Sequence, residues 1–224
     1  MLLPPDPPLE PLHTRDYLVK AFRKGPDQIL LRGAVRDVKP GELFIADDTE
    51  PMTMHHMLVD LTVAFPSLEI LEVDVHFEAH PQQQCPLIID HYDELVGLSV
   101  ARGFTHKVRE LFGGPRGCTH TTALLQAMAP VAVQCGLSMR SASLRGDPAN
   151  LRPRQLTAEE RKAHIVPMIN TCHAWAEDGE LVEWVSTGSR PALPIPIAKR
   201  LVELGRDPGT WGAPTDDARD LTTP

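Results

Sequence analysis

The stretch MLVDLTVAF, residues 57–65, alternates large apolar side chains with small or polar ones. The stretch LEILEVDVHFEA, residues 68–79, follows after the turn residues Pro66-Ser67 and alternates again. A period of two residues is typical of strands that bury one face. The positions expected on the buried faces are Met57, Val59, Leu61, Val63, Leu71, Val73, Val75 and Phe77.

Strand-like sequence also precedes this pair. Residues 14–22 and 28–38 flank Gly25-Pro26-Asp27, which predicts a hairpin, and residues 39–53 read as a loop. The period then changes to helical spacing over residues 85–96, 105–112 and 119–135, with Pro130 expected to kink or break the last helix. Strands followed by helices predict an α+β fold, with an antiparallel sheet and helices packed on one face.

The C-terminal third is less regular. Thr157 and Glu160 fit a capping box that starts a short polar helix, Asp178-Gly179 predicts a hairpin, and residues 196–204 predict a helix that begins at a proline. We therefore expect a proline-rich extended arm over residues 1–12, a single domain over 13–204 and a loose tail over 205–224.

Composition narrows the classes of function. The 224 residues carry a net charge of −8, with scattered Lys and Arg and 5% aromatic residues, which argues against nucleic-acid binding. The apolar run near residues 123–137 is interrupted by Gln126, Pro130 and Gln134, so we expect no membrane contact. The N-terminal sequence does not resemble a signal peptide, so we expect a cytoplasmic protein with four reduced cysteines.

The run Gly117-Cys118-Thr119-His120 places a thiol at the start of the helix predicted over residues 119–135. Unpaired N–H groups and the helix dipole at that end favour a thiolate, which is a nucleophile or a metal ligand. His120 adds a base or a second ligand. The alternative is a buried structural cysteine beside a surface histidine.

Two further candidate residues, His55 and Cys85, are expected at the ends of predicted strands. His55, in the loop before residue 57, is expected to point inward while His56 points away, and Cys85 follows the strand at 68–79. His55, Cys85, Cys118 and His120 suit a divalent metal such as zinc or iron, or an acid/base and thiol set. Tyr92 either packs in the core or offers its hydroxyl as an acid.

Several motifs resemble the bacterial family called domain of unknown function 2889. The matching pieces, between about residues 13 and 190, are His13-Thr14-Arg15, His55-x-Met57, Cys85-Pro86, Tyr92-x-x-Leu95-x-Gly97, Gly117-Cys118-Thr119-His120, Asn170-Thr171-Cys172 and Asp178-Gly179. Family members often have His-Asp-Met where this chain has His55-His56-Met57. The resemblance implies a catabolic lyase that acts on lignin-derived aromatics.

A remoter resemblance is to NifU-type iron–sulfur scaffold proteins, which also run antiparallel strands and then helices. His55, Cys85 and Cys118 take places comparable to the scaffold ligands, although a scaffold has cysteine at the first of them. This resemblance implies a NifU-like core with an N-terminal hairpin and a C-terminal extension.

Three functions follow as hypotheses. The first is a lyase that needs no redox cofactor and releases formaldehyde from a small phenolic substrate by carbon–carbon cleavage. In it a histidine would be the base, and Tyr92 or a metal would stabilise the departing phenoxide. The second is a metal or iron–sulfur carrier, and the third is a non-enzymatic interaction module. A homodimer is the expected assembly.

Overall fold

The computed structural model describes residues 3–101, 103–144, 157–166, 168–188 and 193–210. The chain divides into two compact units, residues 1–143 and 144–224, each described here by itself. The boundaries expected from the sequence, with one domain over 13–204, stay a prediction. Among the described helices, none combines the length and the apolar character needed to cross a membrane.

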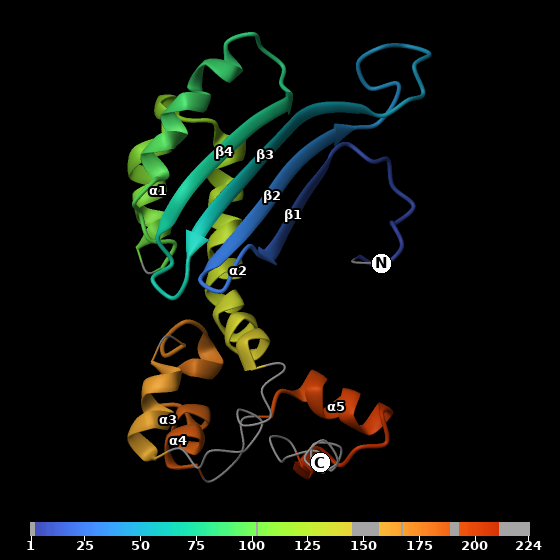
Figure 1. Cartoon of the computed structure of the whole chain (residues 1–224). Helices are drawn as coiled ribbons and strands as arrows, with labels where there is room; N and C mark the ends of the chain where they lie inside the picture. The colour runs from blue at the N-terminus through green and yellow to red at the C-terminus, as the bar shows by residue number, and fades with distance from the viewer. Residues whose placement is uncertain (1–2, 102, 145–156, 167, 189–192, 211–224) are drawn as a thin grey trace, which may run out of the picture. The chain divides into compact units, whose positions relative to one another are not determined.

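A four-stranded antiparallel sheet forms the centre of the first unit (Figure 1). Its strands follow the order of the chain: β1 (Thr14–Arg23), β2 (Gln28–Lys39), β3 (Met52–Ala64) and β4 (Ile70–Ala79). The predicted first hairpin and the antiparallel arrangement are confirmed.

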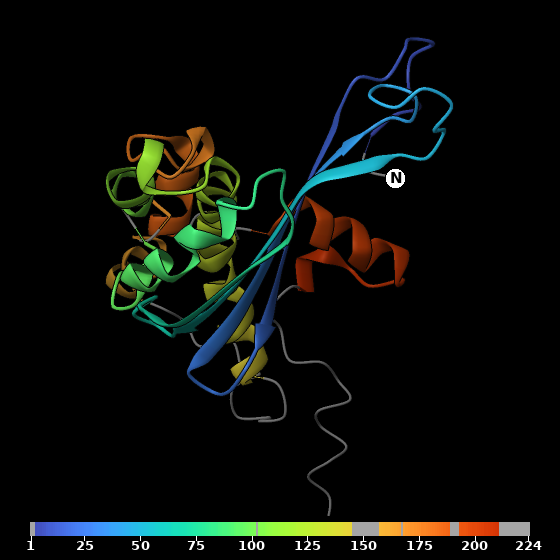
Figure 2. The same ribbon diagram turned by 90° about the horizontal axis from the view of Figure 1, so that it is seen from above.

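Helices follow the strands, as expected. They are the 3₁₀ helix η1 (Cys85–Leu95), α1 (Phe104–Phe112), the short 3₁₀ turn η2 (Gly114–Arg116) and α2 (Thr119–Leu144). Figure 2 shows α1 (green) and α2 (yellow-green) on the same side of the sheet. The α+β class is therefore confirmed, whereas the NifU-like detail is not.

The hydrophobic core lies between this side of the sheet and the helices. Every second residue enters the core from Ile29 to Asp37 in β2 and from Met57 to Leu61 in β3. The largest fully buried side chains are Tyr92, Phe112, Ile29, Leu31, Met57, Leu61, Ile70, Leu95, Leu124, Leu125, Met128 and Val35.

Two sequence expectations within the sheet are wrong. β3 begins at Met52, so His55 and His56 lie in a strand rather than in a loop. Leu71 was expected to be buried, but it is 38% exposed and Ile70 is fully buried in its place. A shift in register between Thr62 and Val63 brings Ile70 opposite Val63, which moves the buried position by one residue.

The expected break at Pro130 is also wrong, because α2 continues through this residue to Leu144. Proline removes one helical hydrogen bond. Pro130 is exposed, so water can satisfy the carbonyl group that loses its donor, while the buried neighbours Met128 and Ala132 keep the helix packed.

The second unit contains α3 (Ala158–Ile165), the 3₁₀ turn η4 (His173–Trp175), α4 (Glu180–Thr187), α5 (Ile195–Glu203) and the 3₁₀ turn η5 (Pro208–Thr210). The capping box of Thr157 and Glu160 is confirmed. The helix predicted over 196–204 is confirmed as α5.

The hairpin predicted at Asp178-Gly179 is wrong. Gly179 instead caps α4, and the acidic residues Glu180 and Glu183 in the first turn of that helix interact favourably with the helix dipole. Of the predicted tail, residues 211–224 lie outside the described part of the chain.

Gly33 of β2 lets α2 approach the sheet closely, and this contact can be tested. A Cβ at Gly33 would lie 2.6 Å from Sδ of Met128 and 3.1 Å from Cδ1 of Leu124. Because both side chains are fully buried, we expect Gly33→Ala to lower the free energy of unfolding by about 1–3 kcal/mol in urea titrations. Gly25→Ala is the control, since its nearest neighbour would be Oδ1 of Asp27 at 3.8 Å. Equal stability of the two variants would contradict this account.

Candidate functional site

A buried carboxylate, Asp37, lies near the end of β2 and is only 1% exposed. Its position continues the inward-facing series of that strand, in which every second residue from Ile29 to Asp37 is turned toward the core side. Arg15 is its partner in the neighbouring strand β1. The guanidinium donates two hydrogen bonds to the carboxylate, from Nε to Oδ1 at 2.5 Å and from Nη2 to Oδ2 at 2.6 Å.

Two histidines from two other elements reach Oδ2 of this carboxylate, and a third, His13, has its Nε2 3.4 Å from Oδ1. His55 is paired with Asp37 across the β2–β3 ladder, and its Nδ1 lies 3.2 Å from Oδ2. His120, in the first turn of α2, brings Nε2 to 3.0 Å from the same oxygen. The two imidazole rings are stacked, with 3.9 Å between their centroids. Oδ2 is thus shared by Arg15, His55 and His120.

The surroundings of Asp37 set the charges of the cluster. Hydrogen bonds from Arg15 hold the pKa of the Asp37 carboxyl well below its usual range, although burial opposes this. The same hydrogen bonds raise the pKa of Arg15. Burial lowers the pKa of His120 below 6.5, helped by His55 and Arg15, and Asp37 only partly opposes it. At neutral pH the centre therefore combines a fixed ion pair with a neutral imidazole at His120.

Cys118 lies directly before α2, and its Sγ is 3.8 Å from Nδ1 of His120. Thiol, imidazole and carboxylate therefore form a continuous series from Cys118 through His120 to Asp37. Gly117 allows this approach, because a Cβ there would lie 2.5 Å from the carbonyl oxygen of Phe112.

Tyr92 is fully buried, and its hydroxyl accepts a 2.7 Å hydrogen bond from the backbone N–H of Cys118. Burial raises the pKa of its phenol. The contact with the Cys118 backbone makes Tyr92 a residue that positions the start of α2, and it gives no support to the expected role as an acid.

Of the four predicted ligands, the structure brings His55 and His120 together and places Cys118 beside His120. Cys85, at the start of η1, is not in the group. Within the described residues, the side chains that could jointly hold a metal ion are Asp37, His55 and His120, with one ligand atom of each within 4.8 Å of the others. Nδ1 of His55 is buried and forms no hydrogen bond with any residue that the structure describes, although it lies 3.2 Å from Oδ2 of Asp37.

Sequence reasoning missed Asp37 and Arg15. A signal for Asp37 was available in the sequence. Every second residue from Ile29 to Val35 is buried, and Asp37 is a charged residue at the next position of this series. Arg15 stood in the His13-Thr14-Arg15 motif, and only the register of β1 against β2 shows that it faces Asp37.

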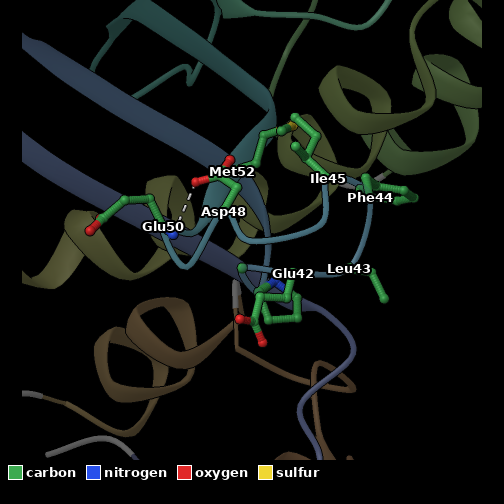
Figure 3. Close-up of a pocket in the computed structure, with 9 residues that line it drawn as sticks. Glu42, Leu43, Phe44, Ile45, Asp48, Glu50 and Met52 are labelled. Carbon is green, nitrogen blue, oxygen red and sulfur yellow. Dashed lines mark hydrogen bonds between the residues drawn. The ribbon is translucent and has the colours of Figure 1, made fainter.

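A loop that carries both acidic and exposed apolar residues borders this centre along the chain. Residues 40–51 connect the strands that carry Asp37 and His55, and they line a small surface pocket (Figure 3). Phe44 is 62% exposed and Ile45 is 53% exposed in this loop. A hydrogen bond from Glu42 N–H to the Asp48 carbonyl closes the loop on itself. The loop thus presents exposed apolar side chains in an ordered turn.

The comparisons with known proteins give one match. The model of the family described as "Protein of unknown function (DUF2889)" matches residues 13–134, which include Arg15, Asp37, His55 and His120. No curated protein and no solved structure matches. The resemblance to DUF2889 is therefore confirmed over the first unit, whereas the resemblance to NifU-type scaffolds is not shown.

Loss of the buried carboxylate should destabilise the fold in a pH-dependent manner. We expect Asp37→Ala to lower the free energy of unfolding by about 2–3 kcal/mol at pH 7, less than for a fully buried pair because Arg15 is 35% exposed. Since the pKa of Asp37 is lowered in the folded state, its contribution is complete above about pH 4 and is lost as the pH falls below that value. The difference between variant and wild type in urea titrations should therefore shrink at pH 3.

The matched control is Asp60→Ala, which removes the carboxylate of a more exposed pair with Arg32 in the same sheet. Its effect should stay within about 1 kcal/mol. An Asp37→Ala variant as stable as Asp60→Ala at pH 7 would refute the central role of the Asp37 pair.

Proposed function

The chain belongs to the DUF2889 family, whose description assigns no activity, and we propose from the site that it is an enzyme performing acid–base chemistry at Asp37, His55 and His120. The observation that carries this proposal is the 3.0 Å contact between Nε2 of His120 and buried Asp37, together with the lowered pKa of that histidine. A neutral imidazole held in one orientation by a carboxylate is suited to act as a general base.

The reaction that we propose is a retro-aldol-type cleavage that releases formaldehyde from a lignin-derived phenolic compound. The base removes the proton of a primary alcohol, and the O–H electron pair forms the C=O bond of formaldehyde. The electrons of the broken C–C bond form a C=C bond and expel a phenoxide. The protonated histidine then returns its proton to that phenoxide, so the step needs no redox partner.

Arg15 and the loop over residues 40–51 are the two features that support an aromatic substrate of this kind. The guanidinium of Arg15 is 35% exposed beside the two histidines, so its positive charge can stabilise a developing phenoxide. The loop over residues 40–51 offers Phe44 and Ile45 as apolar surface for a ring. The substrate class itself rests on the family resemblance.

A cytoplasmic location is part of the proposal. All four cysteines are free, including exposed Cys172, which agrees with a reducing compartment.

The second candidate is a metal-binding protein, favoured by the unpartnered Nδ1 of His55. Two imidazole nitrogens and a carboxylate oxygen suit zinc or iron. A bound ion would supply a Lewis acid, and Asp37, His55 and His120 would hold it. The position of Arg15 argues against a bound metal ion, because this residue already neutralises the Asp37 carboxylate that the ion would need as a ligand.

The enzyme proposal predicts formaldehyde release from phenolic lignin dimers that carry a primary alcohol. We expect His120→Gln and His55→Gln to reduce the rate by about 100-fold or more. His56→Gln is the control, because His56 is the adjacent residue of β3 and its side chain lies on the opposite face. The rate should rise with pH as the imidazole loses its proton, with a midpoint lower than that of an ordinary histidine, since the pKa of His120 is lowered. The proposal is falsified if no such dimer yields formaldehyde with the wild-type protein.

The metal candidate predicts about one zinc or iron ion per chain in elemental analysis of the purified protein. His55→Ala and His120→Ala should lose the ion, whereas Cys85→Ala should keep it, because Cys85 is outside the group. Less than roughly a tenth of an ion per chain in the wild type would exclude a resident metal.

A further inference from the structure

The two edges of the sheet differ in how they are covered. At the outer edge of β4, Ile70 donates its N–H to the carbonyl of Leu98 and accepts from Gly97, and Glu69 forms a bridge with Ser99. β1, at the other edge, is paired with β2 over its whole length without a register shift. It contains neither proline nor a bulge, which are two of the devices that stop an edge strand from adding another strand.

Apolar side chains are exposed along the same strand. Leu18 is 55% exposed, Phe22 is 46% exposed and Tyr17 is 42% exposed. Exposed apolar residues on a regular edge strand that no other described strand covers are typical of a surface that pairs with another strand.

We propose that β1 pairs with β1 of a second copy of this chain, antiparallel and with Leu18 opposite Leu18, so that two sheets become one. In this register Asp16 of each copy lies opposite Lys20 of the other, and Tyr17 lies opposite Val19. Asp16, which lies 3.1 Å from Nη2 of Arg36 in its own chain, would then also face a lysine of the second copy, so the charges of the strand are complementary to those of its own antiparallel copy. This inference does not depend on the proposed function, because its evidence is the edge strand alone.

Neighbouring registers that keep the helices of both copies on the same side lack this complementarity. Centring the pair on Val19 places Arg15 opposite Arg23, and centring it on Lys20 places two lysines opposite each other. Centring it on Tyr17 leaves Asp16 opposite Leu18. Like charges directly opposite each other destabilise a sheet, so the register centred on Leu18 is favoured.

The N-terminal arm extends the same surface. A stable interface buries roughly 800 Å² per partner, which is more than one strand pair provides. Leu9 and Leu12 lie just before β1 and are 75% and 63% exposed. Because the arm continues from β1, it would run along the second copy beyond the paired strands and add apolar contact.

The test is the oligomeric state of the full chain by sedimentation velocity over a range of concentrations. The wild type should be a dimer. Asp16→Lys places two lysines opposite each other in both halves of the pair, and Lys20→Asp places two aspartates there. Each single variant should therefore weaken dimerisation by about tenfold or more. The double variant Asp16→Lys/Lys20→Asp restores opposite charges and should recover most of the dimer.

Glu78→Lys is the control, because Glu78 is exposed on β4 and its change in charge equals that of Asp16→Lys. It should leave the dimer intact. Circular dichroism of each variant shows whether it is folded, which separates loss of the interface from loss of the fold. A monomeric wild type, or a dimer that both single reversals leave unchanged, would overturn the proposal, and so would a double variant as weak as the single ones.

Discussion

The ion pair between Arg15 and buried Asp37 is the constraint on which the rest of the site depends. A carboxylate that is 1% exposed is costly unless its charge is matched and its oxygens are hydrogen-bonded. Arg15 meets both needs with two parallel hydrogen bonds, a geometry that lysine cannot reproduce. The pair forms only when β1 and β2 are in their observed register, so a feature of the first hairpin decides whether the centre exists.

The pair also connects the sheet to the helical layer. His120 contacts Asp37 from α2, while Tyr92 of η1 binds the backbone of Cys118 at the start of the same helix. These contacts fix the beginning of α2 from two sides. Its later turns are held by apolar packing, with Met128 against Gly33. The polar centre and the hydrophobic core therefore orient one helix together.

Much of the fold could be predicted because it depends on local periodicity. The strand over residues 28–38, the alternation over residues 57–65 and the capping box at Thr157 are local signals, and the structure confirms them. Leu71 was misassigned because a register shift is a property of two strands and not of one sequence. The hairpin predicted at Asp178-Gly179 was wrong for a related reason. The same dipeptide can precede a helix when acidic residues follow it.

The candidate site was only partly predictable. His55 and His120 were expected from their chemistry, but Asp37, at the centre, was missed, although it stands at a buried position of the alternation that runs from Ile29 to Val35. Its role follows from three pairings across sequence distance, with Arg15, His55 and His120. Sequence reasoning identifies groups that can do chemistry, whereas the register of strands decides which of them meet.

One oxygen, Oδ2 of Asp37, determines which chemistry the centre can perform. It lies within 3.2 Å of nitrogen atoms from Arg15, His55 and His120, so these groups compete for its lone pairs. While Arg15 is bound, the carboxylate is largely neutralised, and it orients His120 better than it attracts a divalent cation. Movement of Arg15 away from Asp37 would free that oxygen beside two imidazole nitrogens, which is the donor set of a metal site. The position of one guanidinium therefore separates the acid–base function from the metal-binding one.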